Sequence, residues 1–225
     1  MFNLYLQALF HVDSNRDALA SARGALLLTY YVSALDARVN TYWLSNAIYL
    51  AKSIDAHIHD DLDKVSVQRR SQLRRLWYCC LLRDRILALG LRRPMQISAG
   101  ESSFPKLYDK GLHFDTELSM LERANTERDG IESFPALFGL SALLSQVLGV
   151  LSLDPAKSSP RESAATNDKV QACSEDLDQW YMATKAKFHT DDFTDKLIVL
   201  EKNIVYIYYQ YATFIPCRNH SNFKF

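Results

Sequence analysis

Apolar residues recur every three or four positions along most of this chain, which is the spacing of one face of an α-helix. The pattern predicts a short helix over Phe2–Val12, a second over Asp17–Leu35 and a third over Thr41–Ala56. The second and third are joined by a short link, so they are expected to pair as an antiparallel helical hairpin. Asparagine–glycine or aspartate–glycine turns between alternating strands are absent from the sequence. These patterns favour an all-α fold.

A long central helix is predicted from Ser66 to Leu91, before Pro94. Its main apolar face comprises Leu73, Leu76, Trp77, Cys80, Leu81, Leu87, Ala88 and Leu91. Further leucines and Ile86 widen this face, so a free basic stripe is not expected on the helix despite its arginines. We therefore expect antiparallel helical hairpins packed around a buried central helix.

The stretch Ser133–Leu153 contains no charged residue. It is long enough to cross a bilayer, but it contains Pro135 and several polar residues and lacks flanking aromatic and basic anchors. A buried core helix is therefore favoured and no membrane partner is expected. Helical stripes follow over Val170–Phe188 and Asp192–Phe214.

The predicted organisation has four parts. Residues 1–155 form the core of one domain, 156–168 a flexible linker rich in Ser, Pro and Ala, 169–215 the C-terminal helices of the same domain, and 216–225 an unstructured tail.

Charge and cysteine content exclude several classes of protein. Lys plus Arg and Asp plus Glu both number 26, so the formal net charge is +0, which counts against a free-standing nucleic-acid-binding domain. The 4 cysteines show no zinc spacing and are expected to be reduced thiols. We expect no cofactor on this chain, and no glycine-rich phosphate loop or nucleophile motif is present.

The segment from His57 to Asp63 is the best candidate for a metal site, because imidazoles and carboxylates are suitable ligands. An all-helical metal-dependent enzyme is therefore the alternative function. Such an enzyme of the isoprenoid-synthase type needs a second acidic motif, and the nearest attempt, Asn167 to Glu175, has Gln171 where a hydroxyl is wanted. We favour a solvated acidic turn and assign no metal, catalytic or cofactor residue.

Asp84 is the one acid among eight arginines between Arg69 and Arg93, and it lies within the apolar face. A buried carboxylate must be paired, and Arg85, Arg93 and Arg38 are the candidate partners. We expect Asp84 to form a structural ion pair that fixes helix packing.

This stretch resembles the fungal-specific transcription factor domain, the middle homology region of zinc-cluster activators. The family pattern is Arg-Arg-Leu-Trp-Trp, then Asp-Arg, then Gly-Arg-Pro. The corresponding signature and structural-clamp residues are Arg75, Leu76, Trp77, Asp84, Arg85, Arg93 and Pro94, with Tyr78 in place of the second Trp and Arg92 in place of the Gly. The segments Asp36–Leu44, Ala56–His57 and Trp180–Tyr181 also look like the cutinase-activator branch.

The resemblance implies a non-enzymatic regulatory domain of a nuclear transcription factor. Such domains are expected to act through an inducer or intramolecular contacts, with the transcription machinery or the rest of the factor as protein partners. The family's zinc ligands and DNA contacts lie in an N-terminal six-cysteine cluster that these residues do not include, since no cysteine precedes Cys79. We therefore expect zinc and DNA binding outside this chain. We also expect a truncated gene product, because the tail after Pro216 falls where the family continues helical.

Overall fold

The computed structural model describes residues 17–31, 38–61, 65–98, 133–151, 160–187 and 196–220. All the regular elements in these ranges are helices, which confirms the all-α prediction. The helix predicted over Phe2–Val12 lies outside them. Within the described parts of the chain, no helix combines the length and apolar character needed to cross a membrane. The chain divides into two compact units, residues 1–87 with 96–102, and residues 88–95 with 103–225.

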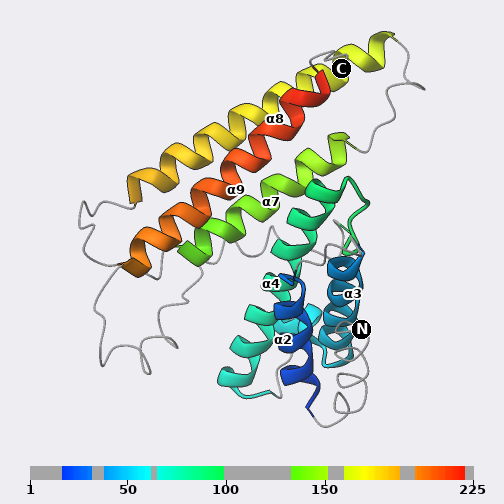
Figure 1. The fold of residues 1–225 in the computed structure, drawn as a ribbon, viewed down its shortest axis with the longest axis vertical. Coiled ribbons are helices and arrows are strands. Elements are labelled where there is room, and N and C mark those ends of the chain that lie inside the picture. Colours follow the sequence, from blue (N-terminus) through cyan, green and yellow to red (C-terminus); the bar gives the residue numbers. More distant parts are fainter. Residues whose placement is uncertain are drawn as a thin grey trace. The chain divides into compact units, whose positions relative to one another are not determined.

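The first unit contains the predicted hairpin, α2 (Ala18–Leu28) and α3 (Val39–Ser53), which run side by side in opposite directions (Figure 1). Asp17 caps α2, since its carboxylate accepts hydrogen bonds from the amides of Leu19 (2.9 Å) and Ala20 (3.3 Å). The helix ends at Leu28, before the predicted limit, and residues 32–37 lie outside the described ranges. Buried apolar residues then make the hairpin core: Leu19, Ala22, Ala25, Val39, Trp43, Leu44, Ala47, Ile48 and Ala51.

After α3 the chain turns sharply at Asp55, whose φ of 60° lies in the left-handed region. The short 3-10 helix η1 (Ala56–Asp61) follows. The long helix α4 (Val67–Leu91) then matches the predicted central helix almost residue for residue. Most of the helix from Leu76 onward is buried, including Trp77, Tyr78, Leu81 and Leu89. The central helix is therefore a core element, as predicted.

The second unit contains the last turn of α4 and three long helices, α7 (Ser133–Leu151), α8 (Pro160–Lys187) and α9 (Lys196–His220). Figure 1 shows α8 running antiparallel to α7 and α9, and each of the three contacts the other two. Their shared core includes Phe138, Leu140, Leu144, Leu177, Val205 and Ala212. At the end of α4, Gly90 lies against the ring of Tyr211 so closely that a Cβ atom there would overlap the Tyr211 hydroxyl.

Three predicted boundaries differ from the structure. The prediction of a flexible linker over 156–168 is wrong from Pro160 onward, because α8 begins there. Proline fits the first position of a helix, where its missing N–H has no partner to lose, and Glu162, Ala164 and Ala165 then favour helix. The prediction of an unstructured tail is wrong up to His220, because α9 continues past Pro216 although a proline removes one N–H from the helix and crowds the preceding turn. The chain also divides into two compact units, whereas one domain was predicted, and α7 belongs with α8 and α9 rather than with the first helices.

Candidate functional site

Asp84, Arg85 and the backbone of Gln96 and Ile97 form a buried polar cluster, which we call the knot, with the Asp84 side chain at its centre. Asp84 is 1% exposed and Arg85 is 0% exposed. The Asp84 carboxylate accepts hydrogen bonds from the backbone amides of Gln96 (3.0 Å) and Ile97 (3.0 Å), and Arg85 Nη1 pairs with it. Arg85 Nη1 also donates to the carbonyl of Ile97 at 2.9 Å. The ion pair thus ties α4 to the segment that follows it.

Burial acts on both members of this pair. It raises the pKa of Asp84 above its ordinary value, while the amides of Gln96 and Ile97 and the charge of Arg85 oppose the shift. Burial likewise lowers the pKa of Arg85, against the effect of Asp84. Either charge buried without the other would destabilise the fold. The arrangement therefore suits a structural role better than proton transfer.

The end of α4 shows why the family pattern has a glycine before Arg-Pro. Arg92 has a φ of 50°, in the left-handed region, and the amide of Arg93 donates to the carbonyl of Ala88 at 3.0 Å. This is a Schellman cap, in which a glycine normally occupies the left-handed position. The chain here carries arginine there, so the turn forms with a backbone conformation that a side chain disfavours.

The other signature residues lie along α4. Trp77 is 1% exposed, and its ring lies 5.8 Å from the ring of His57, centroid to centroid. Leu76 is buried, whereas Arg75 and Arg93 are half-buried and Pro94 is exposed. The structure thus brings Asp84 and Arg85 together in one knot and places Trp77 in the adjoining core, while Arg75 lies apart from them near the surface.

Arg83 is an anchoring residue that the sequence did not single out. It is buried, its Nε donates to Thr29 Oγ1 at 2.8 Å, and its Nη2 donates to the Thr29 carbonyl at 2.6 Å. Its guanidinium also lies over the Tyr30 ring at 3.9 Å. An arginine within an apolar helix was the only signal available, and its partner depends on tertiary contacts.

The acidic segment lies only partly within the described structure. His57 is half-buried beside Trp77, whereas the side chains of residues 59–63 lie outside the described set. Among the described side chains, no group of three His, Cys, Asp or Glu is placed to hold a metal ion. Cys79 and Cys80 are free thiols whose pKa burial raises, for Cys79 to about 11, so neither is an activated nucleophile. The described side chains thus offer no support for the metal-dependent enzyme.

Comparison with known proteins decides the class. Residues 2–182 match the family described as the fungal specific transcription factor domain. The chain belongs to this family. It is 31% identical over 119 residues to the cutinase transcription factor 1 beta of Fusarium vanettenii, which covers 52% of this chain and 13% of that protein. It is 38% identical over 87 residues to the transcription factor cpaR of Aspergillus oryzae, with 37% of this chain and 14% of the relative covered.

A third relative is the acetamidase regulatory protein of Aspergillus fumigatus, 27% identical over 136 residues, covering 53% of this chain and 17% of the relative. The fungal transcription factor domain described here therefore corresponds to a small part of much longer regulators. No solved structure matches the chain. The predicted family is confirmed, and these relatives are named as transcription factors or as a regulatory protein.

Proposed function

We propose that this chain is the regulatory helical domain of a fungal zinc-cluster transcription factor and controls transcription in the nucleus through protein contacts. The observation that carries the proposal is the family match over residues 2–182, with the signature residues Asp84 and Arg85 forming one buried knot. The knot supports a scaffold, because its polar groups are directed at backbone rather than at an open site. DNA contacts and zinc are assigned to a cluster outside these residues.

The proposal also covers partners that the relatives' names do not state. A domain of this kind acts on the transcription machinery or on the rest of its own factor, and a small-molecule inducer is a further ligand class. The formal net charge of +0 agrees with this assignment, because a chain that grips DNA by itself would carry an excess of Lys and Arg.

Tethering the chain to DNA tests the proposal. Residues 1–225 are fused to a heterologous DNA-binding domain in a fungal host, and reporter mRNA is compared with that from the DNA-binding domain alone. A change of several-fold, up or down, at matched nuclear protein level supports the proposal. An unchanged reporter level, with the fusion folded and nuclear, contradicts it. Specific binding of the purified chain to duplex DNA would contradict the assignment of DNA contacts to another segment.

A further inference from the structure

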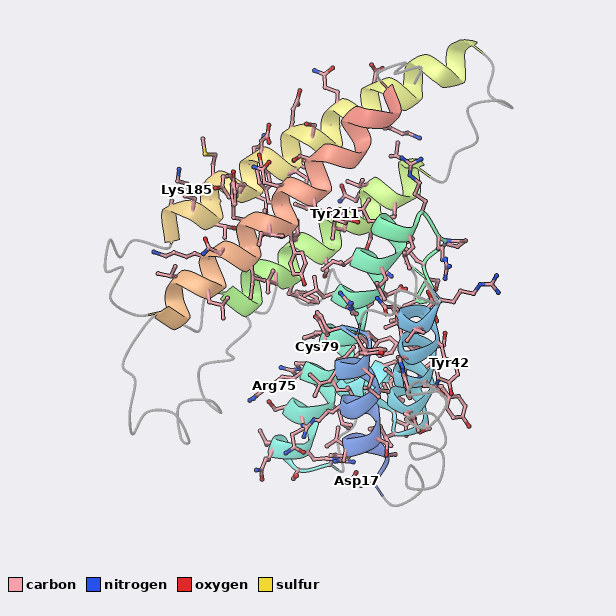
Figure 2. All side chains as sticks on the ribbon, viewed as in Figure 1. Asp17, Tyr42, Arg75, Cys79, Lys185 and Tyr211 are labelled. Carbon is pink, nitrogen blue, oxygen red and sulfur yellow. The ribbon has the colours of Figure 1, made fainter. Side chains whose placement is uncertain are left out.

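Two arginines of the first unit, one on α2 and one on α4, pair with no acidic side chain among the described residues. Arg23 on α2 is exposed and Arg75 on α4 is half-buried. Neither side chain makes a hydrogen bond or ion pair with another described residue, and the Nε atom of Arg75 is buried without a partner. The hydrogen bonds from Arg83 to Thr29 hold the end of α2 against α4. The charges of Arg23 and Arg75 both act to lower the pKa of the Cys79 thiol, against the larger effect of burial. Arg75 and Cys79 lie one helical turn apart on α4 (Figure 2).

Acidic side chains that could neutralise this pair are scarce on the neighbouring helices. The α4 sequence has no acid before Asp84, and that carboxylate is engaged in the knot. Asp17 of α2 caps its own helix, and α3 contributes no acid. On the described helices of this unit, positive charge is therefore in excess around Cys79, and it attracts anionic groups.

Two large apolar side chains follow Arg23, one on α2 and one in the turn just after it. Leu27 is 72% exposed and Tyr30 is 55% exposed, and with Arg23 they follow at spacings of four and three residues, which places them in one row. The Arg83 guanidinium lies over the Tyr30 ring and holds the end of this row beside α4. The surface thus combines two unpaired cations with two exposed apolar groups.

We propose that the row of Arg23, Leu27 and Tyr30, together with Arg75, is a docking face for an acidic protein segment that carries large apolar side chains among its carboxylates. Carboxylates would pair with Arg23 and Arg75, and an apolar side chain would cover Leu27. A nucleic-acid backbone fits less well, because it offers phosphates to only two unpaired cations and leaves Leu27 exposed. The inference rests on the proposed function and deepens it by naming the surface and the class of partner.

Fluorescence anisotropy tests the face directly. The purified full chain is titrated into a labelled synthetic peptide of four Asp-Phe-Asp-Leu repeats at low salt. We expect saturable binding that weakens about tenfold in Arg23→Glu/Arg75→Glu, which corresponds to two surface ion pairs of about 0.7 kcal/mol each. Leu27→Ser should weaken binding several-fold. Lys185→Glu, an exposed residue on α8, is the matched control and should bind like wild type.

Circular dichroism establishes that each variant is folded, and Arg23→Gln/Arg75→Gln replaces the charge reversal if that variant does not fold. Thiol labelling followed by mass spectrometry adds a check on geometry, since loss of the two arginines should slow labelling of Cys79. Labelling that does not change would contradict an effect of the two arginines on this thiol.

Several results would overturn the proposed face. They are absence of peptide binding, equal binding by Arg23→Glu/Arg75→Glu, equally tight binding of an all-aspartate peptide, and tighter binding of a random duplex DNA. The tethered reporter separates the two proposals. A reporter response without peptide binding refutes only the docking face, whereas peptide binding without a reporter response refutes the regulatory role.

Discussion

The substitution Asp84→Ala tests the buried knot because it removes one charge and leaves the other in place. Arg85 would stay fully buried without its ion-pair partner. The amides of Gln96 and Ile97 would lose their acceptor at the same time. Breaking a buried pair on one side costs about 3–5 kcal/mol, and an unsatisfied buried amide costs about 1–3 kcal/mol. These terms overlap, so we expect a loss of at least about 3 kcal/mol.

Such a loss is a large fraction of the stability of an ordinary domain, about 5–15 kcal/mol. Urea unfolding followed by tryptophan fluorescence measures it, because Trp43 and Trp77 are buried in the same unit. Asp178→Ala, which changes an exposed carboxylate on α8, is the control and should leave the fluorescence transition of these residues unchanged. A loss below about 1 kcal/mol in Asp84→Ala would refute the reasoning, since a buried Arg85 would then need no partner.

A double-mutant cycle separates the ion pair from the packing. Arg85→Met and Asp84→Leu each leave one charge, whereas the double variant leaves none. We expect the double variant to lose at least about 1 kcal/mol less stability than the sum of the single variants. Additive losses would show that the two charges do not interact.

Three further predictions concern single side chains. Arg92→Gly should stabilise the chain by about 1 kcal/mol, because glycine accepts the left-handed conformation at the end of α4, whereas Arg92→Ala should give no such gain. Thermal unfolding measures both variants, and equal unfolding midpoints would contradict the proposed helix cap. Cys79 should react with a disulfide reagent at pH 8 roughly a hundredfold more slowly in the folded chain than in urea, because burial raises its pKa to about 11; equal rates would contradict its burial. Tyr209 donates a hydrogen bond to Asp178 at 2.7 Å, and this bond, with burial as the lesser cause, raises the pKa of Tyr209 from 10.0 to about 12. The protonated tyrosine therefore stabilises the folded chain fully below pH 10, and this stabilisation is lost as the pH rises through 12. In Asp178→Ala, the absorbance titration of Tyr209 should move toward pH 10.

The helices were largely predictable because their signals are local. The apolar spacing of α4 and its Ser66 start appear in the sequence, and Ser66 Oγ accepts from the Arg69 amide as a helix cap should. The end of α2 and the start of α8 were misplaced, since Thr29 is held by Arg83 from another helix and Pro160 can open a helix as readily as a loop.

The candidate site could be predicted only in part. A lone acid within an apolar face indicates a buried ion pair, and Arg85 was one of three candidate partners. That Gln96 and Ile97 would present their amides to Asp84 depends on the turn at Arg92, for which the sequence offers no glycine. That Arg23 and Arg75 pair with no described acidic side chain likewise depends on which faces of two helices meet, a property of tertiary structure.

The most direct test of the central claim is reporter transcription from the DNA-tethered chain, with wild type compared with Asp84→Ala and Asp178→Ala at matched nuclear protein level. The claim is that the knot holds together a domain that regulates transcription. It predicts that wild type and Asp178→Ala change reporter mRNA several-fold in the same direction and that Asp84→Ala does not. A wild-type chain without effect, or an Asp84→Ala chain as effective as wild type, would contradict it.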